Sequence, residues 1–289
     1  MGCISCAGLI MQSWDRRDMV ELRLKESAAL PIEAGSICPD FFASRNLTEI
    51  RALPAFCGGY KATLGDLFEI VGDRSNRMII EGDLRHVEKI GWKMSHGRIL
   101  VRGNAGAHLG ACMRGGEIIV EGDVGDWAGA LIQSGYIRIK GNAGYRAGAA
   151  YPGEKSGANR GTIIVEGSAG GEIGAGAKRV LIAVLGDVGE FAGANMIAGT
   201  LIVLGRLGRN AGAGNKRGTI VTLGEPPDIL PTYTYECSIP LVFLRCCFRY
   251  LLNLGLPVPE EAVNGIFHRY SGDAASLVKG EIFVYAKPE

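Results

Sequence analysis

Few residues of this chain have the types and spacing that catalytic or metal chemistry requires. The four histidines, His86, His96, His108 and His268, include no pair with the spacing of a His-Glu-x-x-His zinc motif. The first three lie in neighbouring early repeats, so two of them could meet, but a solvated or hydrogen-bonded imidazole is the simpler interpretation. No serine stands in a Gly-x-Ser-x-Gly elbow, and no cysteine has a recognisable base partner. We therefore expect no catalytic, cofactor-binding or metal-binding residue in this chain.

The eight cysteines favour a reduced, cytoplasmic protein over a disulfide or metal framework. Only Cys3 and Cys6 have the two-residue gap of a metal pair, and no second such pair completes a four-ligand site. The apolar stretch 3–11 has neither the basic start nor the cleavage site of a signal peptide, and no apolar run is long enough to cross a bilayer. The net charge of +1 gives no reason to expect a nucleic-acid or membrane partner.

Glycine, with 44 residues, is the unusual component, and its positions repeat. A glycine closes each Ile-x-Val-x-Gly phrase, mostly at a nineteen-residue step such as that from Gly103 to Gly122, and two more follow at +3 and +7. Recurrence in six repeats without a Gly-Lys-Ser/Thr sequence favours a structural role over phosphate binding. These structural glycines are Gly103, Gly106, Gly110, Gly122, Gly125, Gly129, Gly141, Gly144, Gly148, Gly167, Gly170, Gly174, Gly186, Gly189, Gly193, Gly205, Gly208 and Gly212.

Each repeat contains alternating apolar residues, such as Ile118 and Val120, which predict a strand with one buried face. A turn with Asp or Asn follows, where backbone hydrogen bonds account for Asp123 and Asp187, and then a second short segment such as Trp127-Ala128. One such unit cannot bury its apolar face alone, so neighbours must stack. We predict an all-β fold: a single-stranded parallel β-helix, right-handed, of 19-residue coils, with a short C-terminal appendage of helix and strand.

The repeats divide the chain into four parts. Residues 1–18 are expected to be an N-terminal extension, disordered or arising from a misplaced start, because Met19 resembles a natural one. Residues 19–76 form a lead-in and cap that begins with an edge strand near Val20, residues 77–225 form the glycine-rich β-helix, and residues 226–289 form an appendage with one helix and a terminal strand.

The step from Gly141 to Gly167 is longer than the others, and its seven surplus residues fall within 151–160. Insertions into repeat proteins often emerge on the binding face, although a tolerated surface loop explains the insertion equally well. We predict that it contacts a partner through Tyr151, Lys155 and Arg160. Deleting the surplus residues should then weaken the complex and leave the melting temperature nearly unchanged.

The repeated three-glycine coil resembles the C subunit of formylmethanofuran dehydrogenase, and also the C-terminal β-helix of the glutamate synthase large subunit. The phrase 103–110 (GNAGAHLG), Ile90-Gly91 with Met94 before Gly97, and the late Arg-Tyr-Ser-Gly-Asp at 269–273 look like the former family. The similarity extends from about Val20 to the C-terminal end, whereas residues 1–18 have no counterpart.

The resemblance implies a non-catalytic scaffold subunit of a formyltransferase/hydrolase complex in one-carbon metabolism. Such a complex handles one-carbon units on tetrahydromethanopterin and a methanofuran analogue, and the partners would be a formyltransferase subunit and an amidohydrolase-like subunit. The alternatives are the C subunit of a true tungsten or molybdenum dehydrogenase and a glutamate-synthase-like domain. In each case, metals or molybdopterin would belong to partner chains. A polysaccharide-acting β-helix enzyme is a third possibility, but it would need a secretion signal and a charged cluster on one sheet.

Overall fold

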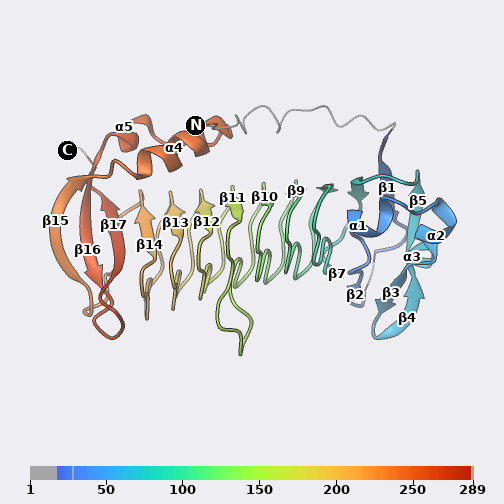
Figure 1. Ribbon diagram of the computed structural model, residues 1–289, viewed down its shortest axis with the longest axis horizontal. Coiled ribbons are helices and arrows are strands. Elements are labelled where there is room, and N and C mark those ends of the chain that lie inside the picture. The colour runs from blue at the N-terminus through green and yellow to red at the C-terminus, as the bar shows by residue number, and fades with distance from the viewer. Residues whose placement is uncertain (1–17, 28, 288–289) are drawn as a thin grey trace.

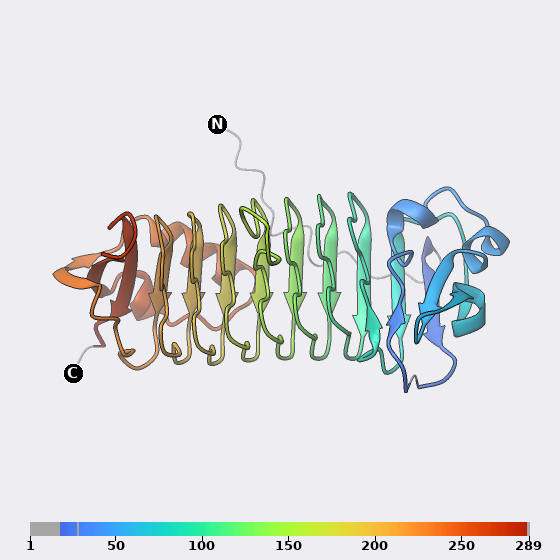
Figure 2. The same cartoon turned by 90° about the horizontal axis from the view of Figure 1, so that it is seen from below.

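A computed structural model describes residues 18–27 and 29–287 of the chain, and it shows a long stack of coils (Figures 1 and 2). The expectation for residues 1–18 and the Cys3/Cys6 pair therefore lie almost entirely outside the described residues. The chain is mostly β-structure, and 13 strands form one large open sheet. Ten of these strands run parallel in chain order. The eight in the middle of this run are β6 (Arg77–Glu81), β8 (Arg98–Arg102), β9 (Glu117–Val120), β10 (Tyr136–Ile139), β11 (Thr162–Val165), β12 (Leu181–Val184), β13 (Thr200–Val203) and β14 (Thr219–Thr222).

The repeat register is kept from coil to coil. Ile137 of β10 lies opposite Ile118 of β9 on one side and Ile163 of β11 on the other, although the insertion lengthens the connection between β10 and β11. The alternate side chains of each strand are fully buried inside the stack, as expected from the period-two pattern.

Beyond its one strand, each coil pairs with the next through a single bridging residue. Ala105, Val124 and Ala143 pair with one another in parallel as isolated bridges, and the same line continues through later coils. The short segments around Trp127 and Phe191 belong instead to the turn that follows each bridge. These residues have positive φ, which ends extended pairing.

The second face of the sheet is also buried where a helix covers it, so the prediction of one buried face was wrong there. Ile164, Ala183, Ile202 and Val221 form one apolar cluster with Leu244, Phe248 and Leu251 of α4 (Leu244–Asn253). The three helix residues are spaced four and three apart, so they share one side of the helix. Figure 1 shows α4 above β11 to β14 and the shorter α5 (Glu260–Val263) beyond it, toward the C-terminal end of the stack.

The N-terminal end of the stack is closed by a compact set of short elements. The strand β1 (Val20–Leu24) was expected at an edge, but it lies between β5 (Phe68–Val71) and β6, because β5 folds back antiparallel beside it. Three short helices and a four-stranded second sheet complete this end. They are α1 (Pro39–Phe42), α2 (Leu47–Arg51), α3 (Leu64–Leu67), β2 (Ile32–Glu33), β3 (Pro54–Cys57), β4 (Tyr60–Thr63) and β7 (Val87–Glu88).

At the other end, β17 (Gly280–Tyr285) continues the parallel order beside β14. Two further strands, β16 (Ile266–Gly272) and β15 (Thr234–Pro240), then add antiparallel to β17. Residues 226–289 thus contain more than the single helix and terminal strand expected from the sequence.

Candidate interaction site

The insertion begins with a residue that turns back onto the stack. The Tyr151 ring lies 4.9 Å from the Trp127 ring and 5.6 Å from the His108 ring, measured between centroids. Its hydroxyl is 2.7 Å from His108 Nδ1. Trp92 of the preceding coil meets His108 edge-on at 6.4 Å. We call Trp92, His108, Trp127 and Tyr151 the aromatic corner.

Cationic side chains flank the aromatic corner. The Arg146 guanidinium lies 4.9 Å from the Trp127 ring centroid and also pairs with Glu172 at 2.9 Å. The Lys93 ammonium lies 6.0 Å from the Trp92 ring. Both distances fall within the range in which a cation is attracted to an aromatic face.

The electrostatics of the aromatic corner favour neutral groups. Burial lowers the pKa of His108 below its usual value, although nearby carboxylates such as Glu88 and Asp126 act in the opposite direction. Burial also raises the pKa of the Tyr151 phenol well above its usual value. A neutral imidazole and a phenol can share one hydrogen bond, so the pair anchors the insertion rather than moving protons.

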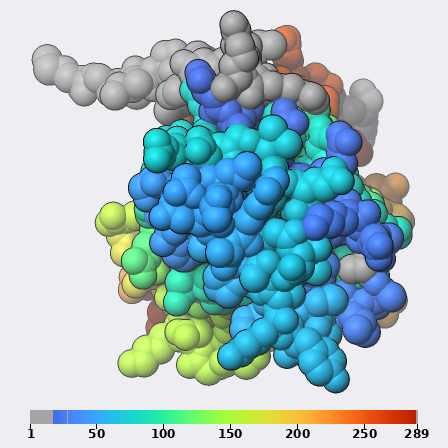
Figure 3. Space-filling view, turned by 90° about the vertical axis from the view of Figure 1, so that its right-hand side faces the viewer, coloured from blue at the N-terminus to red at the C-terminus, as the bar shows by residue number. Residues whose placement is uncertain are grey.

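The other two residues predicted for partner contact are placed differently from Tyr151. Lys155 and Arg160 are both exposed, whereas Tyr151 is half-buried. The backbone N–H of Arg160 donates to the Arg179 carbonyl of the next coil at 3.1 Å. The insertion projects from the side of the stack opposite α4, and Figure 3 shows it in yellow-green on the same side as the cyan β3–β4 hairpin.

A second group of residues combines serine, histidine and aspartate near α1. The Ser95 hydroxyl donates to Asp40 through a short hydrogen bond and lies 3.0 Å from His96 Nδ1. In a catalytic triad the histidine stands between the serine and the acid, whereas here Asp40 binds Ser95 directly. Burial alone would raise the pKa of Asp40, but the hydrogen bonds from Ser95 lower it on balance. This group therefore ties α1 to the first coils.

The cysteine beside this group has the chemistry of a buried thiol. Cys38 lies 3.2 Å from Asp40, and burial raises the pKa of its thiol to about 12. It is a poor nucleophile at neutral pH, because the thiolate is the reactive form.

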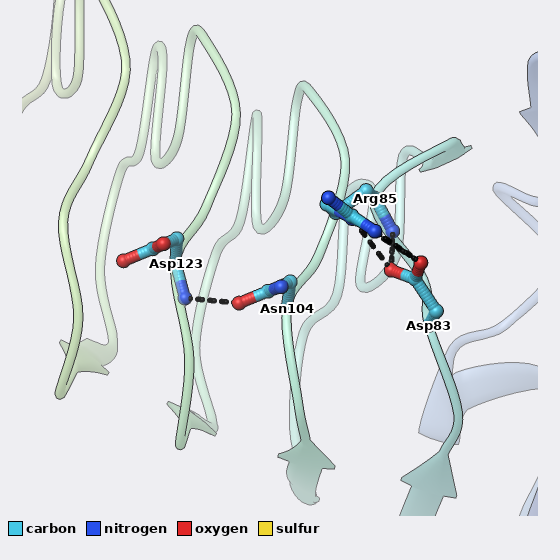
Figure 4. Close-up of polar contacts among 4 residues, drawn as sticks. All are labelled: Asp83, Arg85, Asn104 and Asp123. Carbon is cyan, nitrogen blue, oxygen red and sulfur yellow. Dashed lines mark hydrogen bonds and ion pairs between the residues drawn. The ribbon is translucent and has the colours of Figure 1, made fainter.

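The polar residues of the strand-ending turns form a ladder between coils. The backbone N–H of Asp123 donates to the side chain of Asn104 at 2.8 Å (Figure 4). Asp123 in turn accepts from the backbone of Asn142 at 2.7 Å, and Asp187 accepts from the backbone of Arg206 at 2.8 Å. The expected backbone hydrogen bonds are thus present, but they reach the next coil rather than the residue's own turn.

At the start of the ladder the pattern changes, because Asp83 pairs with Arg85 at 2.7 Å instead of reaching the next coil (Figure 4). Across residues 18–27 and 29–287, no group of three or more His, Cys, Asp or Glu side chains is placed to hold a metal ion. Within the same residues, none of the helices has the length and apolar character that a membrane span needs.

Sequence reasoning singled out Tyr151 and His108 separately but did not join them. It also missed Trp92 and Arg146. The spacing of these residues in the sequence could have indicated the cluster. Trp127 and Arg146 follow His108 at successive steps of one coil period, so the three occupy equivalent places in consecutive coils. In-register stacking brings such residues together.

The fold and site together describe a chain of stacked glycine-rich coils whose most distinctive side chains gather on an outer edge. No family model matches the sequence. A chain in the crystal structure of the formyltransferase/hydrolase complex (FhcABCD) from Methylorubrum extorquens, solved with methylofuran, superimposes with a TM-score of 0.85 and 36% identity. This match covers 92% of the present chain and 100% of that chain.

Shorter matches connect the chain to archaeal proteins. The C subunit of a tungsten-containing formylmethanofuran dehydrogenase 2 from Methanothermobacter thermautotrophicus is 38% identical over 92 residues, which is 34% of its length. The C subunit of the molybdenum-containing formylmethanofuran dehydrogenase 1 of the same organism is 40% identical over 88 residues, which is 22% of its length. The aligned region thus spans about a third or less of the length of each of these curated relatives. It belongs to the family of the C subunits of formylmethanofuran dehydrogenase and the formyltransferase/hydrolase complex.

Proposed function

We propose that this chain is a non-catalytic scaffold subunit of a formyltransferase/hydrolase complex. The observation that carries the proposal is the full-length match to a chain of the Methylorubrum complex at 36% identity. The matches to the archaeal dehydrogenase subunits are local, covering about 30% of this chain, and so favour that alternative less.

The described side chains support a scaffold role. The polar side chains of the types used in catalysis make structural hydrogen bonds instead. Ser95 and Asp40 join α1 to a coil, and Asp123 and Asp187 each join one coil to the next. In the complex, we expect metals or molybdopterin, if present, to belong to partner subunits. The one-carbon carriers would be a methanofuran analogue and tetrahydromethanopterin, and the complex would be cytoplasmic.

We interpret the stack as a right-handed parallel β-helix over residues 77–225, with residues 19–76 as its cap and 226–289 as its appendage. The three glycines of each coil would support it in two ways. A Cβ added to Gly122 or Gly125 would come within about 3 Å of the backbone of the preceding coil. A Cβ added to Gly129 would instead meet Ile163 Cδ1 at 2.7 Å, and the φ of +62° there also favours glycine.

The proposed partners are a formyltransferase subunit and an amidohydrolase-like subunit. We propose that the tip of the insertion contacts one of them through Lys155, with Arg160 beside it, while Tyr151 holds the loop against the stack. These roles are assigned from solvent exposure, because the two basic side chains are exposed whereas the Tyr151 ring is packed on Trp127.

Affinity purification of the tagged chain from its native host tests the proposal. We expect a formyltransferase and an amidohydrolase-like protein to co-purify without iron–sulfur proteins. Iron–sulfur and molybdopterin proteins in the eluate would move the assignment to the dehydrogenase. Formyl-transfer or hydrolase turnover by the isolated chain, abolished by mutating one of its own residues, would contradict the non-catalytic role.

A further inference from the structure

One position in the coils has an unusual backbone conformation for the residues it holds. The fifth residue after each strand-ending glycine has φ between 56° and 63° in six coils, and it is never glycine. We call these residues the corner row: His108, Trp127, Arg146, Glu172, Phe191 and Asn210.

The neighbouring positions show that glycine is available for this conformation. Two residues further along, every coil has glycine, with φ between 61° and 73°. Two residues beyond that, φ is positive at Gly176 and Gly214 in two coils and at Cys112, Leu131 and Asn195 in three others. Glycine adopts such φ values without the steric cost that side chains incur. The corner row therefore keeps a side chain in every coil although its backbone conformation favours glycine. Such a conformational cost indicates that these side chains have a function.

The corner row presents side chains typical of protein interfaces. All six residues are at least partly exposed, and Phe191 retains 40% of its exposure. Tyr145, next to Arg146 in the sequence, retains 61%. Aromatic residues and arginine are enriched at protein–protein interfaces and supply most hot spots, where partly exposed aromatic side chains become buried.

The length of the row also suits an interface. Five coil steps of about 4.8 Å separate His108 from Asn210, which gives a row about 24 Å long. A square patch of about 800 Å² per partner has an edge of about 28 Å, so the row could line the middle of one standard interface.

The charges of the row indicate the kind of partner. Arg146 and Glu172 neutralise each other across adjacent coils at 2.9 Å, so the row offers no excess charge to a polyanion. The Trp127 ring already contacts Tyr151 and Arg146, which leaves its face unsuited to stacking on a sugar. An uncharged, largely apolar protein surface is complementary to such a row.

We propose that a partner subunit docks on the corner row. The surface with which the partner contacts the row carries no net charge and is largely apolar. This inference rests on the proposed function as a subunit of a complex. It places the contact along six coils, with the insertion as a raised rim beside it, rather than on the loop tip alone.

Phe191→Gly tests the proposal, because glycine suits φ at this position and removes only the side chain. The matched control is Asn195→Gly, in the same coil, where φ is 55° and the side chain is also exposed. Tagged wild-type and variant chains are co-expressed with the partner subunits, and partner recovery and affinity are measured. The melting temperature of each isolated tagged chain is measured separately.

We expect Phe191→Gly to keep or raise the melting temperature of the isolated chain and to weaken partner binding at least tenfold. Asn195→Gly should leave binding at the wild-type level. Wild-type binding by Phe191→Gly, or a melting temperature several degrees below wild type, would overturn the proposal, the latter by indicating a structural role. Wild-type chain that recovers only copies of itself would overturn the partner assignment. Failure of the wild type to recover any protein would instead refute the proposed function, and the docking edge with it.

Discussion

At the scale of single residues, the hydrogen bond between Tyr151 and His108 is the best-defined contact of the insertion. It joins residues 43 positions apart, and two tryptophan rings surround it. The contact buries a polar pair without a charge, which costs less free energy than burying an ion. The same burial makes the aromatic corner sensitive to acid.

The lowered pKa of His108 gives a pH dependence with a definite sign. As pH falls below about 6.5, the unfolded chain protonates this imidazole first, so the unfolded state binds more protons than the folded state. The free energy of unfolding should therefore decrease as pH falls from about 6.5 to the lower folded pKa, and the loss should level off below that. At higher pH both states are neutral at this position, and the contribution is constant.

Urea denaturation at a series of pH values checks this prediction. We expect His108→Asn, whose amide can still hydrogen-bond the Tyr151 hydroxyl, to show a smaller decrease across the same interval than the wild type. Identical slopes for the two proteins would mean that His108 does not titrate differently in the folded and unfolded states.

At the scale of the coil, the close approach of successive backbones sets the strictest requirement on the sequence. A Cβ at Gly208 would lie 2.5 Å from the carbonyl carbon and oxygen of Gly189, and φ at Gly208 is not positive. Gly153 in the insertion is the converse case, with φ of +88° and no heavy atom within 4 Å of an added Cβ. Substitution at Gly208 therefore tests the steric effect of coil stacking, and substitution at Gly153 tests the cost of the backbone conformation.

We predict that Gly208→Ala lowers the free energy of unfolding by about 3 kcal/mol, because the clash is with backbone that cannot rotate away. Gly153→Ala should cost about 1 kcal/mol, for the conformation alone. Chemical denaturation followed by circular dichroism measures both values. Equal losses for the two variants would show that coil stacking does not require glycine at position 208.

At the scale of the whole molecule, the insertion interrupts the period without shifting the strands. Ala158 resumes the buried position that Ile132 holds one coil earlier, so residues 151–157 are the surplus. Removing them would join Ala150 to Ala158 in the spacing of the other coils. A loop without contacts would be removed at no cost, but Tyr151 packs on Trp127 and His108.

We therefore predict that deletion of residues 151–157 lowers the melting temperature by about 3–6 °C, since the lost hydrogen bond and ring contacts contribute about 1–2 kcal/mol. This revises the expectation from sequence that stability would hardly change. The double substitution Glu154→Ser and Lys155→Ser is the control, because both side chains are exposed and the melting temperature should stay the same. An unchanged melting temperature in the deletion would show that Tyr151 adds no stability.

The repeated sequence by itself determined the coil, its strand and the register between coils. Residues such as Ile118 and Ile137 could be paired correctly from the sequence because the nineteen-residue period is local, and in-register stacking follows once each unit has an exposed apolar face. The family resemblance could also be read from glycine spacing and short phrases, and the full-length structural match agrees with it.

Only the tertiary structure decided which outer surfaces are covered and where the insertion turns. Tyr151 packs on residues from earlier coils, α4 buries a second face of the sheet, and β5 displaces β1 from the edge. These contacts join segments with no shared period, so no local pattern predicts them. Positive φ at Trp127 and Phe191 was equally hidden, because such side chains disfavour it and only the stacked backbone imposes it.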